Sequence, residues 1–255
     1  MKITLLGTGT SQGVPVIGCQ CKVCQSHTDK DKRLRTSAMI EWDNHRFVID
    51  CGPDFRTQML RKKVDHLDGI LLTHEHADHT AGLDDIRPLY FKNKKPLPVY
   101  ALPRVIDNLT KRFDYIFTNE NRYPGAPEVA PKILHSGTKF NLFDLEVTPL
   151  KILHGNLPIL GYKFNNFAYI TDAKIIPEMS LNAIKNIDLL IINALHKKPH
   201  KMHMNLEEAL KLIANVKPQK AVLTHISHHM GLYEQVASSL PNNIVLGYDG
   251  MEIQL

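Results

Sequence analysis

Long apolar stretches are missing from this sequence. No apolar run approaches the roughly 18 residues that a membrane-spanning helix needs, so we expect no transmembrane segment. The N-terminal residues lack the apolar centre of an export signal, because Gly7, Thr8, Gly9 and Thr10 interrupt it. Internal repeats, low-complexity tracts and linker-like stretches are absent as well. These absences predict a cytoplasmic protein in which residues 1–255 form a single domain.

A strong excess of either charge is also missing. The 31 basic and 26 acidic residues leave a net charge of +5 with histidines neutral, which suits an anionic substrate without demanding nucleic acid. The densest basic run contains only Lys92, Lys94 and Lys95 and is expected to be a solvated loop. A Gly/Lys/Arg-rich insertion of the kind needed for a tRNA-binding arm is absent. The sequence therefore favours a small anionic partner and no membrane partner.

Cysteine is scarce, but its placement is informative. Three of the four cysteines are Cys19, Cys21 and Cys24. Without an export signal, this spacing indicates a metal site rather than disulfide bonds, and three thiolates suit a structural zinc ion once a fourth ligand arrives. His228 is the natural fourth ligand, although a redox cluster is the alternative. The fourth cysteine, Cys51, follows an apolar strand and is expected to be buried and unreactive.

Short β-branched runs alternate with helical periodicity along the chain. Helices are expected at Arg104–Asp114, Pro177–Ile184 and Asn205–Val216, and Asn205 with Glu208 forms a plausible capping box. Hairpin-like pairs mix with strand–helix–strand units, which predicts a fold of the α/β (α+β) class with mixed sheets covered by helices. The strands that matter most for function are expected at Gly69–Thr73, Leu145–Leu153, Phe167–Thr171 and Ala221–Thr224.

Histidine is abundant, with 14 residues, and metal-ligand types follow several of these strands. His74, His154, Asp172 and His225 each stand at a strand end. Side chains at neighbouring strand ends can converge at one edge of a sheet while the core holds them rigid. We therefore expect them to contribute to one pocket.

The densest cluster is the segment from Thr73 to His79, which reads Thr-His-Glu-His-Ala-Asp-His. It carries His74, His76, Asp78 and His79 within six residues, and imidazole and carboxylate groups are good ligands for divalent first-row metals. A short loop with this spacing can direct its side chains at two neighbouring metal ions. Asp50, at the end of an earlier strand, either orients this loop or is a plain strand-end aspartate.

The order of these residues resembles the metallo-β-lactamase superfamily, in which His-x-His-x-Asp-His is followed by distant His, Asp and His residues. The resemblance implies a four-layer αββα sandwich with the site at its edge. It also implies ligands for two metal ions: His74, His76 and His154 for the first, Asp78, His79 and His225 for the second, and Asp172 bridging both.

Further segments narrow the resemblance to the PhnP-type branch of cyclic phosphodiesterases. They are Gly7–Pro15, Gly18–Cys24, Leu71–His74, Leu223–His228 and Asp249–Ile253, which span essentially the whole chain. This resemblance implies that Cys19, Cys21, Cys24 and His228 hold a structural metal ion.

The PhnP-type resemblance also implies a general acid. His203, just before the expected helix at Asn205, would protonate the leaving alkoxide. The sequence departs from the namesake around His200, so His196 and His200 stay open as alternative acids. The candidate catalytic residues are therefore His203 and Asp78, the second of which is also a metal ligand.

Taken together, these features predict a metal-dependent phosphoric diester hydrolase. We expect attack by metal-bound hydroxide on a small, cyclic phosphodiester such as ribosyl 1,2-cyclic phosphate. The expected cofactors are two catalytic divalent ions, manganese or zinc, and one structural zinc ion. The oligomeric state is left open, with a homodimer as one possibility. The alternatives are a ribonuclease Z-like RNA-processing endonuclease, a β-lactam or thioester hydrolase, and a non-catalytic metal-binding protein.

Overall fold

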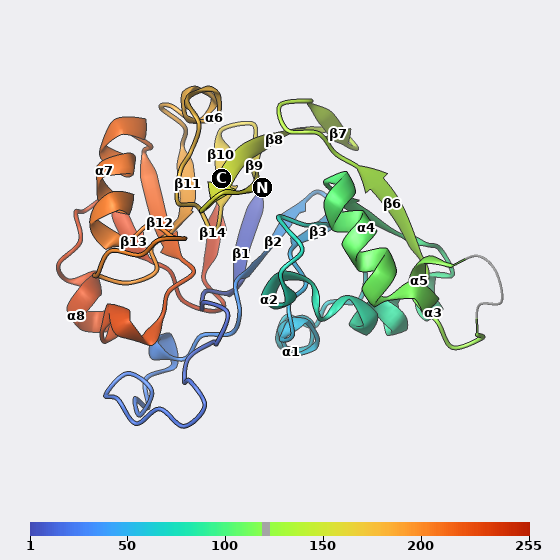
Figure 1. Cartoon of the computed structure of the whole chain (residues 1–255), viewed down its shortest axis with the longest axis horizontal. Coiled ribbons are helices and arrows are strands. Elements are labelled where there is room, and N and C mark those ends of the chain that lie inside the picture. Colours follow the sequence, from blue (N-terminus) through green and yellow to red (C-terminus); the bar gives the residue numbers. More distant parts are fainter. Residues whose placement is uncertain (119–122) are drawn as a thin grey trace. The chain divides into compact units, whose positions relative to one another are not determined.

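The computed structural model describes residues 1–118 and 123–255. The chain folds into two compact units, each built on one seven-stranded sheet (Figure 1). The first unit consists of Met1–Gly7, Arg35–Leu134 and Gly250–Leu255, and the second of Thr8–Leu34 and His135–Asp249. The single domain over residues 1–255 stays a prediction. In the described part of the chain, no helix has both the length and the apolar character needed to cross a bilayer.

The sheet of the first unit is antiparallel in one half and parallel in the other. From one edge to the other, its strands are β14 (Glu252–Gln254), β1 (Lys2–Gly7), β2 (Ser37–Trp42), β3 (His45–Ile49), β4 (Gly69–Leu71), β5 (Leu97–Ala101) and β6 (Val129–Ile133). Neighbours from β14 to β3 are antiparallel, and β3 to β6 are parallel. The carboxyl ends of β3 and β4 therefore lie at the same edge of the sheet.

Helices accompany the first sheet, and most of them add apolar side chains to its core. They are α1 (Phe55–Arg61), α2 (Ala77–Thr80), α3 (Arg87–Asn93), α4 (Pro103–Arg112) and α5 (Asp114–Phe117). Helix α4 begins with proline at its first position, where no backbone donor is needed, and buries Val105, Ile106 and Leu109. These side chains join Val48 and Ile70 of the strands in one apolar cluster, so α4 is a rigid platform.

The sheet of the second unit has the same division. Its strands are β13 (Ile244–Leu246), β12 (Lys220–Thr224), β11 (Leu189–Asn193), β10 (Phe167–Ile170), β9 (Leu157–Phe164), β8 (Leu145–His154) and β7 (Phe140–Leu142). Strands β10 to β13 are parallel, and β7 to β10 are antiparallel. Because β8 and β10 both pair antiparallel with β9, they run in the same direction, and the ends of β8, β10 and β12 share one edge.

Three helices accompany the second sheet: α6 (Glu178–Ala183), α7 (Leu206–Val216) and α8 (Tyr233–Ala237). Helix α7 buries Ala209, Ile213 and Val216 in one cluster with strand residues such as Ile192 and Leu223. Full burial of such a side chain contributes about 1.5–3 kcal/mol, so this packing fixes the strand ends.

A buried polar network joins three distant segments of the second unit. The Asp249 carboxylate accepts hydrogen bonds from the backbone N–H and hydroxyl of Thr8, at 2.9 and 2.8 Å, and from the Leu34 N–H at 2.7 Å. The buried Arg33 guanidinium donates to the Thr8 hydroxyl at 2.7 Å and to the Gly247 carbonyl at 2.6 Å. Burial raises the pKa of Asp249 to about 6 and lowers that of Arg33 to about 10.

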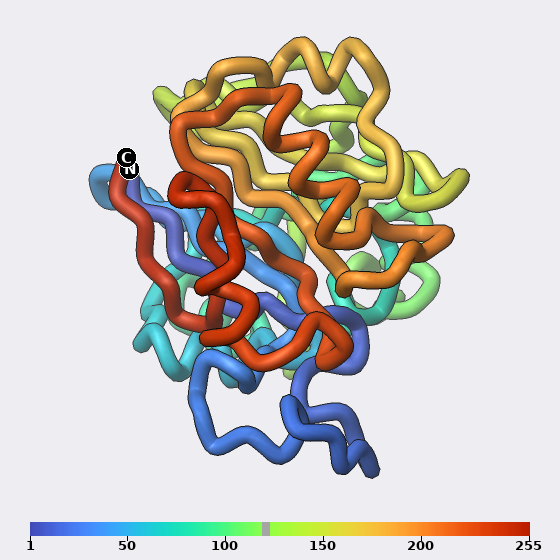
Figure 2. Tube along the Cα trace, turned by 90° about the vertical axis from the view of Figure 1, so that its left-hand side faces the viewer, coloured from blue at the N-terminus to red at the C-terminus, as the bar shows by residue number. Residues whose placement is uncertain are grey.

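The two ends of the chain lie side by side (Figure 2). Strand β1 pairs antiparallel with β14, with Lys2 opposite Gln254 and Thr4 opposite Glu252. The N-terminal ammonium donates to the carbonyl of Leu255 at 2.8 Å. Strand β14 thus forms one edge of the first sheet, next to β1.

The fold class predicted from the sequence is confirmed, since the protein is a mixed α/β structure with two sheets and helices. The strands expected before the candidate ligands are β4, β8, β10 and β12, within three residues of the predicted bounds at each end. The capping box is confirmed as well: Asn205 Oδ1 accepts from the Glu208 N–H, and Glu208 accepts from the Asn205 N–H, both at 2.9 Å. Of the α-helices in the described residues, the sequence analysis did not predict α1, α2, α3, α5 and α8.

Candidate metal centre

In the first unit, the segment after β4 brings four of the predicted ligands together. The prediction of a simple loop from Thr73 to His79 is wrong in its second half, because Asp78 and His79 lie in the short helix α2. The helical turn is held by Thr80, whose hydroxyl donates to the His76 carbonyl at 2.9 Å. His74 Nε2 and His76 Nδ1 are 2.9 Å apart, and Asp78 Oδ2 lies 3.3 Å from His79 Nε2.

Asp50 is the buried anchor of this ligand segment. Its carboxylate accepts from the Thr73 N–H at 2.8 Å and from His79 Nδ1 at 2.7 Å, and the Thr73 hydroxyl donates to it at 2.9 Å. Burial raises the pKa of Asp50, whereas the neighbouring His79 lowers it. Of the two roles left open for Asp50, the structure shows the orienting one.

These contacts fix which ring nitrogens carry a proton. His79 donates through Nδ1 to Asp50, so its Nε2 presents a lone pair. The Thr73 hydroxyl uses its only proton toward Asp50 and therefore accepts from His74 Nδ1 at 3.0 Å, which leaves the lone pair of His74 on Nε2. Nitrogen lone pairs beside a carboxylate oxygen form a donor set that suits a divalent cation.

Glycine is required where the Asp50 turn meets helix α2. Any side chain at Gly52 would collide with the Asp78 carbonyl, and one at Gly82 would collide with the Gly52 carbonyl. The turn and the helix are also joined by the Cys51 N–H, which donates to the His79 carbonyl at 2.8 Å. The expected burial of the Cys51 side chain is confirmed, and burial raises the pKa of its thiol.

In the second unit, three strand ends bring the remaining predicted residues together. His154 ends β8, Asp172 follows β10 and His225 follows β12, and all three side chains are buried. His225 Nε2 lies 3.1 Å from Asp172 Oδ1, and His203 Nδ1 lies 3.5 Å from the same oxygen. His154 donates through Nδ1 to the Met202 carbonyl at 3.0 Å, which leaves its Nε2 lone pair available.

The backbone is strained at the strand-end positions. Asp172 and His225 have φ values of 57° and 55°, and Asp50 in the first unit has 63°. This left-handed conformation costs a residue with a side chain on the order of 1 kcal/mol. In the second unit, Asn193 supports it, because its side chain accepts from the Ala173 N–H at 2.8 Å and donates to the Ala173 carbonyl at 3.0 Å. Asn193 was missed in the sequence because its role depends on a contact 20 residues away.

The structure ranks the three candidate acids by their distance from this cluster. The ring of His203 stacks on His225 with centroids 4.8 Å apart, and it lies 4.6 Å from the ring of His154. The ring of His200 lies 5.1 Å from His203, and that of His196 is a further ring away, 5.8 Å from His200. Burial lowers the pKa of His203 to about 3, and the neighbouring His225 adds to the effect.

The cysteine cluster assembles within the second unit as the sequence predicts. The Sγ atoms of Cys19, Cys21 and Cys24 lie 3.3, 3.5 and 3.3 Å from Nδ1 of His228. All four ligand atoms are within 4.8 Å of one another. The Cys24 N–H lowers the pKa of Cys21, whereas burial raises that of Cys24 to about 11. Three sulfurs and one imidazole at this spacing suit a closed zinc site.

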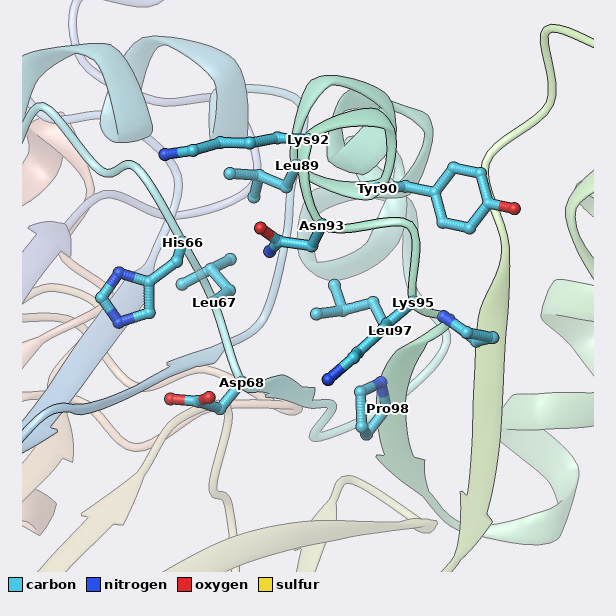
Figure 3. A pocket seen from close by; sticks show the side chains of 11 residues that line it. His66, Leu67, Asp68, Leu89, Tyr90, Lys92, Asn93, Lys95, Leu97 and Pro98 are labelled. Atoms are coloured by element: carbon cyan, nitrogen blue, oxygen red, sulfur yellow. The ribbon is translucent and has the colours of Figure 1, made fainter.

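A pocket of about 590 Å³ lies elsewhere in the first unit, between the 66–68 segment and the connection from α3 to β5 (Figure 3). Its lining includes His66, Tyr90, Lys92 and Lys95 but none of the predicted ligands. The chemistry-bearing groups therefore lie at the strand ends and not in this pocket.

The family of the chain follows from comparison with known proteins. Residues 45–226 match the family model described as the beta-lactamase superfamily domain. The chain belongs to this family. The resemblance to this superfamily that the sequence predicts is confirmed. The similar proteins also support the prediction that the chain is a metal-dependent hydrolase.

A crystal structure described as a new diphosphatase from the PhnP family has a TM-score of 0.92 and 38% sequence identity, with 99% of this chain and 96% of that chain covered. Zn²⁺-bound PqqB from Methylobacterium extorquens has a TM-score of 0.81, with both chains fully covered, but its 18% identity shows the fold alone.

A protein of Porphyromonas gingivalis (strain ATCC BAA-308 / W83), named octanoyltransferase, is 44% identical over 254 residues. The alignment covers 99% of this chain and 51% of that protein. The chain thus spans about half the length of the curated relatives that it matches.

Proposed function

We propose that this protein is a dinuclear-metal phosphodiesterase that hydrolyses a small, cyclic phosphodiester. The observation that carries the proposal is the ligand chemistry: buried histidines with Nε2 lone pairs set by hydrogen bonds, next to carboxylates at strand ends. The neighbour described as a PhnP-family diphosphatase supports phosphate as the substrate class. The expected specificity for a cyclic diester such as ribosyl 1,2-cyclic phosphate is part of the proposal.

The metal assignment is proposed as the family resemblance implies it. By that resemblance His74, His76 and His154 would hold one ion, Asp78, His79 and His225 would hold the other, and Asp172 would be shared. When bound, a divalent pair, manganese or zinc, would supply positive charge for phosphate oxygens and would activate water near neutral pH. The cysteine cluster is proposed to hold a structural zinc ion. A cytoplasmic location and a homodimer stay predictions.

His203 is proposed as the general acid that protonates the leaving alkoxide. Its ring lies partly buried beside Asp172, and with a pKa of about 3 it is neutral near pH 7. An anionic phosphodiester beside the ring would raise that pKa, since an opposite charge favours the protonated form. His200, one ring farther out, is the matched control.

The test compares leaving groups. An alkoxide leaves slowly without a proton, whereas a nitrophenolate leaves readily. His203→Ala should slow ribosyl cyclic phosphate hydrolysis by on the order of 10²–10⁴-fold and leave an aryl phosphodiester nearly unaffected. His200→Ala should affect neither strongly. Equal losses on both substrates in His203→Ala would show that this residue positions substrate or supports a metal ion instead.

A second candidate follows from the relative named octanoyltransferase. Its name favours an acyl compound, so hydrolysis of an acyl thioester is the alternative activity for this chain. Turnover of octanoyl thioester and of aryl phosphodiester by the same zinc- or manganese-loaded protein separates the two. Thioester cleavage without phosphodiester cleavage would replace the leading proposal.

A further inference from the structure

A pair of arginines from helix α4 contacts the ligand segment between its metal-binding side chains. Glu75 stands between His74 and His76, and its side chain is 16% exposed. Arg104 Nη2 donates to one Glu75 carboxylate oxygen at 3.0 Å, and Arg104 Nε lies 3.0 Å from the other. This two-point contact, one hydrogen bond and one ion pair, limits the orientation of the carboxylate as well as its position.

The second arginine holds the backbone of the same segment. Arg112 Nη1 donates to the Glu75 carbonyl at 3.0 Å and to the Thr80 hydroxyl at 2.9 Å. The Thr80 hydroxyl in turn donates to the His76 carbonyl at 2.9 Å. Arg112 therefore holds two consecutive carbonyls by hydrogen bonds, that of Glu75 directly and that of His76 through the Thr80 hydroxyl.

The platform that carries these arginines is rigid. Val105, Ile106 and Leu109 anchor α4 in the apolar cluster of the first unit. A partly exposed ion pair contributes little to stability, roughly 0–1 kcal/mol. The contacts are thus better suited to fixing ligand geometry than to holding the fold together. Groups that orient metal ligands in this way typically change metal affinity by 10–100-fold when removed.

We propose that Arg104 and Arg112 are positioning residues for the metal-ligand segment, acting through Glu75 and Thr80. The inference rests on the proposed function, because it assigns them a role in shaping the metal site. Arg104 and Arg112 set the direction of the His74 and His76 side chains by fixing the residue between them and the carbonyls beside them.

The test uses Arg104→Gln, Arg112→Gln and Glu75→Gln, with Lys111→Gln as the control on an exposed residue of the same helix. Zinc affinity is measured by competition with a chelating dye. Each arginine variant should bind zinc about 10-fold more weakly, and Lys111→Gln should match the unmodified protein. The double variant of Arg104 and Glu75 should lose no more than either single variant, since the two act as one contact.

Hydrogen exchange of the 74–80 segment in chelator-treated protein tests the same contacts without metal. It should rise in both arginine variants while the melting temperature of the chelated protein stays near that of the unmodified protein. Arg104→Lys keeps the charge but not the two-point contact. Its zinc affinity and its hydrogen exchange should therefore lie between those of the unmodified protein and those of Arg104→Gln. Additive losses in the Arg104 and Glu75 pair, or unchanged zinc affinity and exchange in both arginine variants, would overturn the inference. A protein that binds zinc normally but cleaves no phosphodiester would refute the proposed function and leave this result standing.

Discussion

Replacing Asp50 by asparagine should separate metal affinity from stability. The Asp50 carboxylate accepts from the Thr73 N–H and from His79 Nδ1, and it is fully buried. In Asp50→Asn, the amide oxygen can still accept from Thr73, but the amide nitrogen then faces His79. The imidazole can satisfy that donor only by accepting at Nδ1, which moves its proton to Nε2. The nitrogen proposed to bind metal would then carry a hydrogen.

We therefore expect Asp50→Asn to weaken zinc binding by about 10–100-fold with only a small change in the free energy of unfolding. Asp50→Ala should behave differently, because it leaves the Thr73 N–H and His79 Nδ1 buried without an acceptor. At about 1–3 kcal/mol for each orphaned group, it should lower the free energy of unfolding by about 2–6 kcal/mol.

The assays are zinc competition with a chelating dye and urea unfolding of the chelated protein. Asp65→Asn is the control, since Asp65 is an exposed aspartate that pairs with His66 and Arg46. Zinc affinity in Asp50→Asn within twofold of the unmodified protein would refute the assigned protonation of His79.

Two further changes test other parts of the structure. Cys21→Ser should lower the melting temperature of the zinc-loaded protein by several degrees, because it removes one of the four proposed ligands that tie the 19–24 segment to His228. An unchanged melting temperature would mean that the cluster holds no structural metal ion. Burial raises the pKa of Asp249 from 3.8 to about 6, so the folded protein binds the proton more tightly and loses stability as pH rises through this window. Urea unfolding of the chelated proteins measures the difference in free energy of unfolding between the unmodified protein and Asp249→Asn. This difference should shrink by about 2 kcal/mol from pH 4 to pH 6, and a constant difference would contradict the raised pKa.

The candidate metal ligands can be picked out from the sequence because their signal is local. Apolar strands such as those before His74 and Asp172 are readable from β-branched residues, and a ligand-type side chain directly after a strand stands out. The cysteine cluster is equally local, with three ligands in six residues. Residue type and spacing carry the inference in both cases.

Contacts between distant segments could not be predicted in the same way. Nothing in the sequence near Arg104 or Arg112 indicates that they reach Glu75, because the contact depends on how α4 packs on its sheet. The choice of His203 over His196 and His200 depends on the path of an irregular segment, for which periodicity gives no register. The short helix α2 escaped for a related reason: four residues are too few to show a helical period.

The pairing of β1 with β14 has a consequence for protein engineering. With the first and last residues 2.8 Å apart at the ammonium and carbonyl, a linker of a few glycines would join them at little entropic cost. The two strands would then form an ordinary hairpin, and the backbone could be opened at a surface turn instead.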